Sequence, residues 1–149
     1  MKKSIKLINK VLLIILLFFG MLTLNGCGMK KEINKAKETL TSFMEYLKEE
    51  NYNEAAKLFH PDVNCTAESI SDTAYDLQQE YGLDFSKDFK IIRSNSVYIS
   101  LYDSQFDGSK AEIVFETTLG EIELYVKILS VSNEKGEGIY SLYFEKIEK

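Results

Sequence analysis

His60 is the only histidine in this 149-residue chain, and histidine is the residue type best suited to proton transfer near neutral pH. Asp62 lies two residues on. His60 also stands beside Pro61 at the predicted end of a helix, where a donor or cation stabilises the last carbonyl groups. We therefore expect His60 to cap a helix C-terminus, and we predict no catalytic residue.

Other chemical motifs are absent from the sequence. It contains no zinc-protease, phosphate-loop, dinucleotide-binding, paired-cysteine or nucleophile-elbow pattern. Residues 103–108 match the opening of a calcium-binding loop, but Val114 stands where that loop needs a glutamate. We expect no metal and no cofactor, and we interpret Asp107-Gly108 as a hairpin turn.

Four acidic residues form a charge pattern that suits binding. They recur at every fourth position of a predicted helix, opposite its apolar side: Glu68, Asp72, Asp76 and Glu80. Like charges at this spacing destabilise a helix by about 0.2–0.5 kcal/mol per pair, so the pattern does not serve the helix itself. We interpret it as either a solvated face or a strip that binds a cation or a basic partner.

The first 26 residues have the features of a secretory signal peptide. Four lysines precede an apolar run from Val11 to Leu24: Lys2, Lys3, Lys6 and Lys10. The run is shorter than the roughly 20 apolar residues that a membrane-spanning helix needs. We predict a cleaved leader over residues 1–26, with an uncleaved anchor as the alternative.

The end of this run resembles the lipobox of bacterial lipoproteins, with Leu24, Asn25, Gly26 and Cys27 in order. The resemblance implies that Cys27 carries a diacylglyceryl group and becomes the N-terminus after cleavage behind Gly26. Two acyl chains anchor a protein durably, at about 0.8 kcal/mol per buried methylene group. The expected location is the outer face of the cell membrane, with residues 27–31 linking the lipidated cysteine to a domain over residues 32–149.

Charge and cysteine content narrow the set of partners. The leader holds four of the 18 basic residues and none of the 23 acidic ones, so the mature charge is 14 − 23 = −9. This charge argues against nucleic acid as a partner.

Once Cys27 is acylated, Cys65 has no partner for an intrachain disulfide. We expect Cys65 to be either a buried thiol just before a helix or an exposed thiol that can cross-link two molecules.

Three helices are predicted before Gly82, which is a suitable residue to end the third. Asn51 is the predicted N-cap of the second helix and Pro61 its predicted end. Each helix has one apolar side. The apolar side of the first helix comprises Ile33, Ala36, Leu40, Phe43 and Leu47. That of the second comprises Ala55, Ala56, Leu58 and Phe59, and that of the third, over residues 67–81, comprises Ala67, Ile70, Ala74, Leu77 and Tyr81.

From Asp88 onward the apolar period changes to two, which predicts four strands. The residues with core parity are Phe89, Ile91, Val97, Ile99 and Leu101; Ala111, Ile113, Phe115 and Leu119; Ile122, Leu124, Val126 and Ile128; and Tyr140, Leu142 and Phe144. An interruption over residues 93–96 indicates a bulge. The expected fold class is α+β, with three N-terminal helices packed on a curved four-stranded antiparallel meander sheet after a cleaved signal peptide.

This order of elements resembles the nuclear transport factor 2-like superfamily, the SnoaL-like or cystatin-like cone folds, and in particular small lipoproteins of Gram-positive bacteria. The resemblance covers roughly Glu32 to Glu148 and includes a long first helix that leads through residues 43–56 into a short second one. It implies a cone that encloses a core or a pocket, and it implies no particular reaction. We expect the walls of such a pocket to be Phe89, Ile99, Phe115, Leu124 and Leu142.

The other face of the sheet is predicted to carry four tyrosines: Tyr98, Tyr102, Tyr125 and Tyr143. By parity they share this face with Val114, Leu129, Ile139 and Ile147. Tyrosine on a partly apolar surface is typical of an interface, although a solvated sheet face also tolerates scattered apolar residues. This face is therefore a candidate contact for a second copy or for another envelope protein.

The sequence favours a membrane-anchored, extracytoplasmic lipoprotein that acts as a binding or protein-interaction module and not as an enzyme. One alternative is a small SnoaL-like enzyme with its active site inside the cone. Another is a structural envelope protein with no ligand pocket. An ionisable group buried in the pocket would favour the enzyme, whereas apolar walls would favour binding or packing.

Overall fold

The computed structural model describes residues 28–148 of the chain, and Ile33–Lys149 forms a compact unit by itself. The predicted signal peptide and Cys27 lie outside the described residues. The first helix is described over residues 28–48. The later elements are α2 (Tyr52–Ala56), a short 3₁₀ helix η1 (Pro61–Val63), α3 (Ala67–Tyr81), β1 (Phe89–Asp103), β2 (Gly108–Leu119), β3 (Ile122–Asn133) and β4 (Gly136–Lys146).

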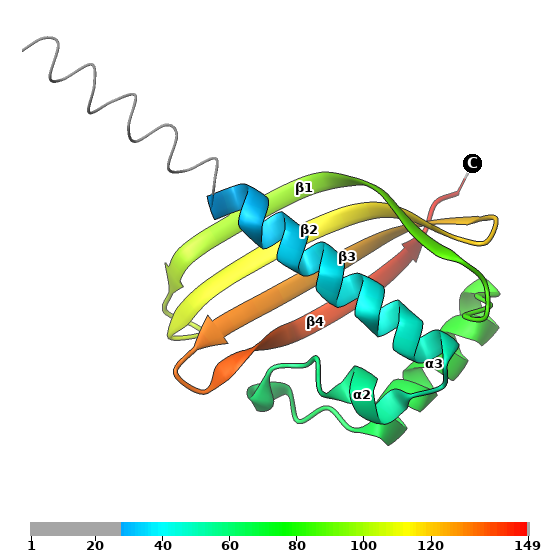
Figure 1. Cartoon of the computed structure of the whole chain (residues 1–149), viewed down its shortest axis with the longest axis horizontal. Coiled ribbons are helices and arrows are strands. Elements are labelled where there is room, and N and C mark those ends of the chain that lie inside the picture. Colours follow the sequence, from blue (N-terminus) through cyan, green and yellow to red (C-terminus); the bar gives the residue numbers. More distant parts are fainter. Residues whose placement is uncertain (1–27, 149) are drawn as a thin grey trace, which may run out of the picture. The chain divides into compact units, whose positions relative to one another are not determined.

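The compact unit is an α+β fold in which three α-helices precede an open antiparallel sheet of four strands in the order β1-β2-β3-β4. From Ile33 onward the first helix lies across one face of the sheet, while α2 and α3 lie beyond the C-terminal end of this helix (Figure 1). The predicted class and strand order are confirmed. Short hairpins produce this meander because consecutive strands then pair with each other.

Local capping explains where the shorter helices begin and end. The Asn51 side chain accepts a hydrogen bond from the Glu54 N–H, as predicted for an N-cap, and Gly82 ends α3 in the left-handed conformation at φ 68°. The prediction that Pro61 ends the second helix is wrong. Helix α2 stops at Ala56, and Pro61 begins η1, because a proline at the first helical position lacks only an N–H that would be unpaired there.

Bulges in β1 change which side chains face the core. The pairing with β2 shifts between Ile91 and Arg93 and again between Ser94 and Ser96, which confirms the predicted interruption. A third shift, between Ser100 and Asp103, was not predicted. As a result Leu101, expected in the core, is 89% exposed, because each unpaired residue reverses the alternation that follows it.

A bulge in β4 has the same effect. Leu129 pairs with Ser141 and Ser130 pairs with Ile139, so Tyr140 is left without a partner in the ladder. Ile139 was predicted on the face of the sheet that carries the four tyrosines (the tyrosine face). It is instead fully buried in the core, and Tyr140 lies outside the core cluster. An inserted residue moves its neighbours to opposite faces of the sheet.

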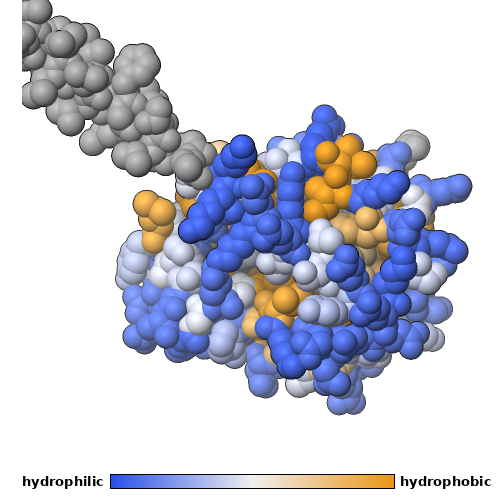
Figure 2. Space-filling view, viewed as in Figure 1, coloured by the Kyte–Doolittle hydropathy of each residue, from blue (hydrophilic) through white to orange (hydrophobic). Residues whose placement is uncertain are grey.

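The core lies between the helices and the sheet. Leu40 and Phe43 of the first helix and Ile70 of α3 join the inward side chains of β2, β3 and β4 in one buried cluster. Figure 2 shows that the surface seen from the helix side is mostly hydrophilic, with separate hydrophobic areas between the polar side chains.

Candidate functional site

A cavity of about 150 Å³ lies between the first helix, α3 and β4. Its floor consists of buried apolar side chains: Phe43, Leu47, Ile70, Ala74 and Phe144. The exposed residues Ser69 and Thr73 and half-buried neighbours surround its mouth: Phe59, Cys65, Leu77 and Leu142. The cavity is partly open to solvent.

The position of this cavity corrects the prediction from sequence. Of the five predicted wall residues, only Leu142 lines it. Phe115 and Leu124 are fully buried and pack in the same cluster as Leu40, because the first helix fills the inner face of the sheet. The observed cavity lies where the end of that helix meets α3.

The polar atoms at the mouth are already hydrogen-bonded within the protein. The Ser69 hydroxyl donates to the Thr66 carbonyl at 2.8 Å, and the Thr73 hydroxyl donates to the Ser69 carbonyl at 2.8 Å. Both hydroxyl protons are therefore used, and the hydroxyl oxygens remain only as acceptors. No Asp, Glu, Lys, Arg or His is among the lining residues of this cavity. These walls suit an uncharged apolar group and supply no acid or base.

The Cys65 thiol is one of the lining groups and is half-buried. Its sulfur lies 3.7 Å from the Ser69 hydroxyl oxygen, just before the start of α3. Its exposure is intermediate between the two states predicted for it.

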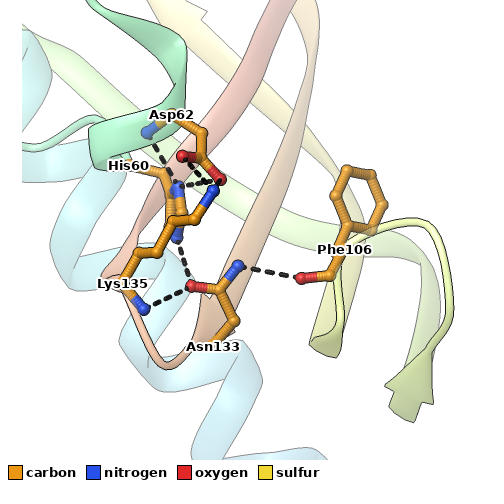
Figure 3. A network of polar contacts seen from close by, with 5 residues as sticks. All are labelled: His60, Asp62, Phe106, Asn133 and Lys135. Carbon is orange, nitrogen blue, oxygen red and sulfur yellow. Dashed lines mark hydrogen bonds and ion pairs between the residues drawn. The ribbon is translucent and has the colours of Figure 1, made fainter.

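A polar cluster, the His60 network, lies beside the start of β4 and comprises His60, Asp62, Phe106, Asn133 and Lys135 (Figure 3). The His60 Nδ1 accepts a hydrogen bond from the Asp62 N–H at 3.2 Å, so its Nε2 carries the proton and donates to Asn133 Oδ1 at 3.1 Å. Asn133 in turn donates to the Phe106 carbonyl at 2.8 Å and accepts from the Lys135 N–H at 2.9 Å. The network therefore joins three loops that are far apart in the sequence.

The predicted C-terminal capping role of His60 is wrong. His60 is 1% exposed, and its side chain caps the N-terminus of η1 through the Asp62 N–H. The cause is the early end of α2, which places His60 after the helix and against the sheet. Because both ring nitrogens are engaged inside the protein, this histidine has a structural arrangement and not that of a general base.

Backbone pairing places the chain around His60 along the edge of β4. The His60 N–H donates to the Ile139 carbonyl at 2.8 Å, and the Ile139 N–H donates to the Leu58 carbonyl at 2.9 Å. Phe59, which lies between these donors and acceptors, lines the cavity. The His60 network and this pairing therefore hold one wall of the cavity in place.

An ion pair completes the network at the surface. The Lys135 ammonium group lies 3.0 and 3.2 Å from the two carboxylate oxygens of Asp62. Hydrogen bonding to Asp62, with its negative charge, raises the pKa of Lys135 above its usual value. Both partners are substantially exposed, so this pair contributes little to stability.

Three of the four tyrosines predicted for the tyrosine face are well exposed: Tyr98 (57%), Tyr102 (65%) and Tyr143 (57%). Tyr125 is half-buried. In the ladder, Tyr98 lies opposite Glu112, and Tyr143 lies opposite Lys127. The tyrosines are therefore interspersed with charged side chains.

These charges are paired with each other. Lys127 lies 2.8 Å from Glu112, and Arg93 lies 2.7 Å from Glu116. The Lys110 ammonium group is 5.5 Å from the centre of the Tyr98 ring. The outer face thus carries separate tyrosines within a set of ion pairs.

The β1–β2 turn has the predicted hairpin geometry. Asp107 is in the left-handed conformation at φ 50°, and β2 begins at Gly108. The Asp103 carboxylate lies 2.6 Å from the Lys110 ammonium group, which lowers the pKa of Asp103 and raises the pKa of Lys110. In residues 28–148, no three His, Cys, Asp or Glu side chains are grouped so as to hold a metal ion.

The four acidic residues Glu68, Asp72, Asp76 and Glu80 are all exposed on α3, while Ile70 and Ala74 of the same helix are buried. The structure thus places the acidic strip on the solvent side of α3, away from the core.

Comparison of the chain with protein families, with curated proteins and with solved structures finds no match. Among the helices over residues 28–148, none is long and apolar enough to span a membrane.

Proposed function

We propose that this chain is an extracytoplasmic lipoprotein, anchored to the cell membrane through Cys27, whose domain acts by binding. The observation that carries the proposal is the sequence Leu24-Asn25-Gly26-Cys27 at the end of a short apolar run that four lysines precede. The apolar run from Val11 to Leu24 is too short to span a bilayer but suits a cleaved signal peptide. The diacylglyceryl group on Cys27 then keeps the domain at the outer membrane face.

The domain supports binding over catalysis. The described cavity has no acidic or basic wall residue, and the buried histidine uses both ring nitrogens for hydrogen bonds within the protein. A SnoaL-like enzyme would need an ionisable group that faces a pocket. We also propose that the domain is of the nuclear transport factor 2-like type, which the order of its helices and its antiparallel sheet supports.

Changing Cys27 to alanine tests the anchor. The variant is expected to remain an uncleaved precursor, because the residue that would be acylated is missing. Intact-mass analysis of membrane fractions from the producing cells should show a diacylated chain that begins at Cys27 for the unchanged protein. Cys65→Ala is the control and should be processed normally. A soluble chain cut at another position would contradict the proposal.

The tyrosine face supports a second candidate role, which is pairing with another copy of this chain. The face carries both signs of charge in neighbouring pairs, Lys127 with Glu112 and Arg93 with Glu116. A two-fold interface brings the same patch together twice, so such a mixture can be complementary to itself. Exposed tyrosines are residues that often dominate interface energies. The remaining alternative, a structural envelope protein with no ligand pocket, would act only through this face.

Removing two tyrosines tests this pairing. A shortened chain of residues 31–149, which contains the whole described core, is expected to self-associate. In the double variant Tyr98→Ala, Tyr125→Ala the dissociation constant should rise at least about 30-fold, from a loss of roughly 2 kcal/mol. Sedimentation equilibrium measures both. Tyr75→Ala, an exposed tyrosine on α3, is the control and should leave the association unchanged. A strictly monomeric unchanged chain at high concentration would refute the pairing.

A further inference from the structure

We infer that the cavity between the first helix, α3 and β4 is a binding site for an uncharged apolar group of about the size of benzene. The group belongs either to a free small molecule or to the end of a larger apolar molecule such as a lipid acyl chain. The inference deepens the proposed binding function, but it does not depend on how the chain is anchored.

The size of the cavity sets the size of its occupant. Its volume of about 150 Å³ is below the range of pockets for drug-sized ligands, which begins at about 300 Å³. An apolar protein cavity of about 150 Å³ admits a benzene molecule. The structure therefore selects a single ring or a short branched or linear hydrocarbon group.

The walls select an apolar occupant over a charged one. The floor is apolar, and the rings of Phe43 and Phe59 meet at one side with centroids 6.0 Å apart at an interplanar angle of 69°. A charged ligand would lose its hydration without gaining an opposite charge, because no ionised side chain lines the cavity. This absence is notable in a mature domain with a net charge of −9, in which charged side chains are abundant.

The hydroxyl groups at the mouth strengthen the argument. The protons of Ser69 and Thr73 are committed to backbone carbonyls, so they offer a ligand no hydrogen-bond donor. Ordered water in a cavity needs two to four polar partners. The Ser69 oxygen also accepts the Thr66 N–H at 3.0 Å, so the two hydroxyls leave mainly the Thr73 oxygen as an acceptor for water. Water inside this cavity therefore has few strong partners, and an apolar group can displace it.

The test uses the full chain in phosphatidylcholine nanodiscs, with ¹³C-labelled methyl groups observed by NMR while benzene is added. Methyl signals of the cavity residues Leu47, Ile70 and Leu142 should shift and saturate. Signals of Ile113 and Val126, which are fully buried and do not line the cavity, should not move. Shifts of equal size at both sets of methyl groups, or no saturable shift, would overturn the inference.

Two variants make the assignment specific. Ala74→Leu places a larger side chain in the cavity floor and should weaken benzene binding at least tenfold. Ala67→Leu makes the same change in the same helix outside the cavity lining and should leave binding unchanged. If Ala74→Leu does not fold, Thr73→Phe, at an exposed position of the mouth, should weaken binding by obstructing entry. Unchanged affinity in the folded variants would refute the site.

A competition experiment identifies the source of the group. Monomeric dihexanoylphosphatidylcholine should displace benzene if acyl chain ends are the occupant, and this result supports the inference with lipid as the source. Saturable benzene binding that the lipid does not displace supports it with a free small molecule as the source. Failure of benzene to bind overturns the inference even when Cys27 is acylated, so the two proposals fail separately.

Discussion

Replacing His60 with alanine is expected to destabilise the domain by about 3–4 kcal/mol. Loss of a fully buried ring leaves a cavity, which for aromatic residues typically costs about 3–5 kcal/mol. The Asp62 N–H also loses its acceptor, and a buried donor without a partner costs about 1–3 kcal/mol. We place the expected value in the lower part of this range, because Asp62 is near enough to the surface for water to reach its amide.

Urea unfolding of the shortened chain of residues 31–149 measures this effect. Lys135→Ala is the matched control, because it removes a surface ion pair from the same network and should cost less than about 1 kcal/mol. If both variants lose the same free energy of unfolding, the buried ring does not hold the three loops together.

Gly138→Ala is expected to cost about 2–3 kcal/mol for a different reason. A Cβ atom at this position would lie 2.6 Å from the His60 nitrogen, 2.7 Å from the Phe59 carbonyl carbon and 2.9 Å from the Leu58 oxygen. These are all backbone atoms, so the chain around His60 would have to separate from β4. The two hydrogen bonds between His60, Leu58 and Ile139 would break, and each contributes about 1 kcal/mol net.

Hydrogen exchange locates this damage. The amide protons of His60 and Ile139 should exchange much faster in Gly138→Ala than in the unchanged protein, while those of the β2–β3 ladder should keep their relative protection. Gly82→Ala is the control, because its Cβ would meet nothing within 4 Å and only the left-handed backbone opposes it. That variant should cost about 1–2 kcal/mol. A smaller cost for Gly138→Ala than for Gly82→Ala would refute the steric argument.

His60→Ala and Gly138→Ala should also weaken benzene binding, because the His60 network holds one wall of the cavity in place. Phe59 lies in the paired stretch and forms part of the cavity wall. When the stretch separates from β4, the wall loses its fixed position, and a ligand must order it again on binding. Lys135→Ala leaves the backbone pairing intact and should leave the affinity unchanged.

Local patterns were enough to predict much of the fold. Helix α3 begins at Ala67 and ends at Tyr81, as predicted from its apolar spacing and from Gly82. The four strands follow from alternation and turn residues, and each depends on neighbours in the sequence. Two of the three bulges of β1 appeared in the sequence as an interruption of that alternation, whereas the third, between Ser100 and Asp103, did not.

The errors occurred where a single residue changes the register. Nothing in the sequence near Ile139 and Tyr140 indicates which of the two is the extra residue of a bulge, because both are apolar enough for the core. Leu101 was misplaced for the same reason. Which residue becomes the extra residue of a bulge depends on pairing with strands that lie elsewhere in the chain.

The sequence by itself determined the α+β class, the order of helices and strands, and the acidic charge, because these depend on composition and on contacts between near neighbours. Only the tertiary structure decided the position of the cavity and the role of His60. The cavity depends on how Leu47, Ala74 and Phe144 from three distant elements fit together. His60 is held by Asn133, which is 73 positions away in the chain. Such contacts form when the elements pack, and no local pattern specifies them.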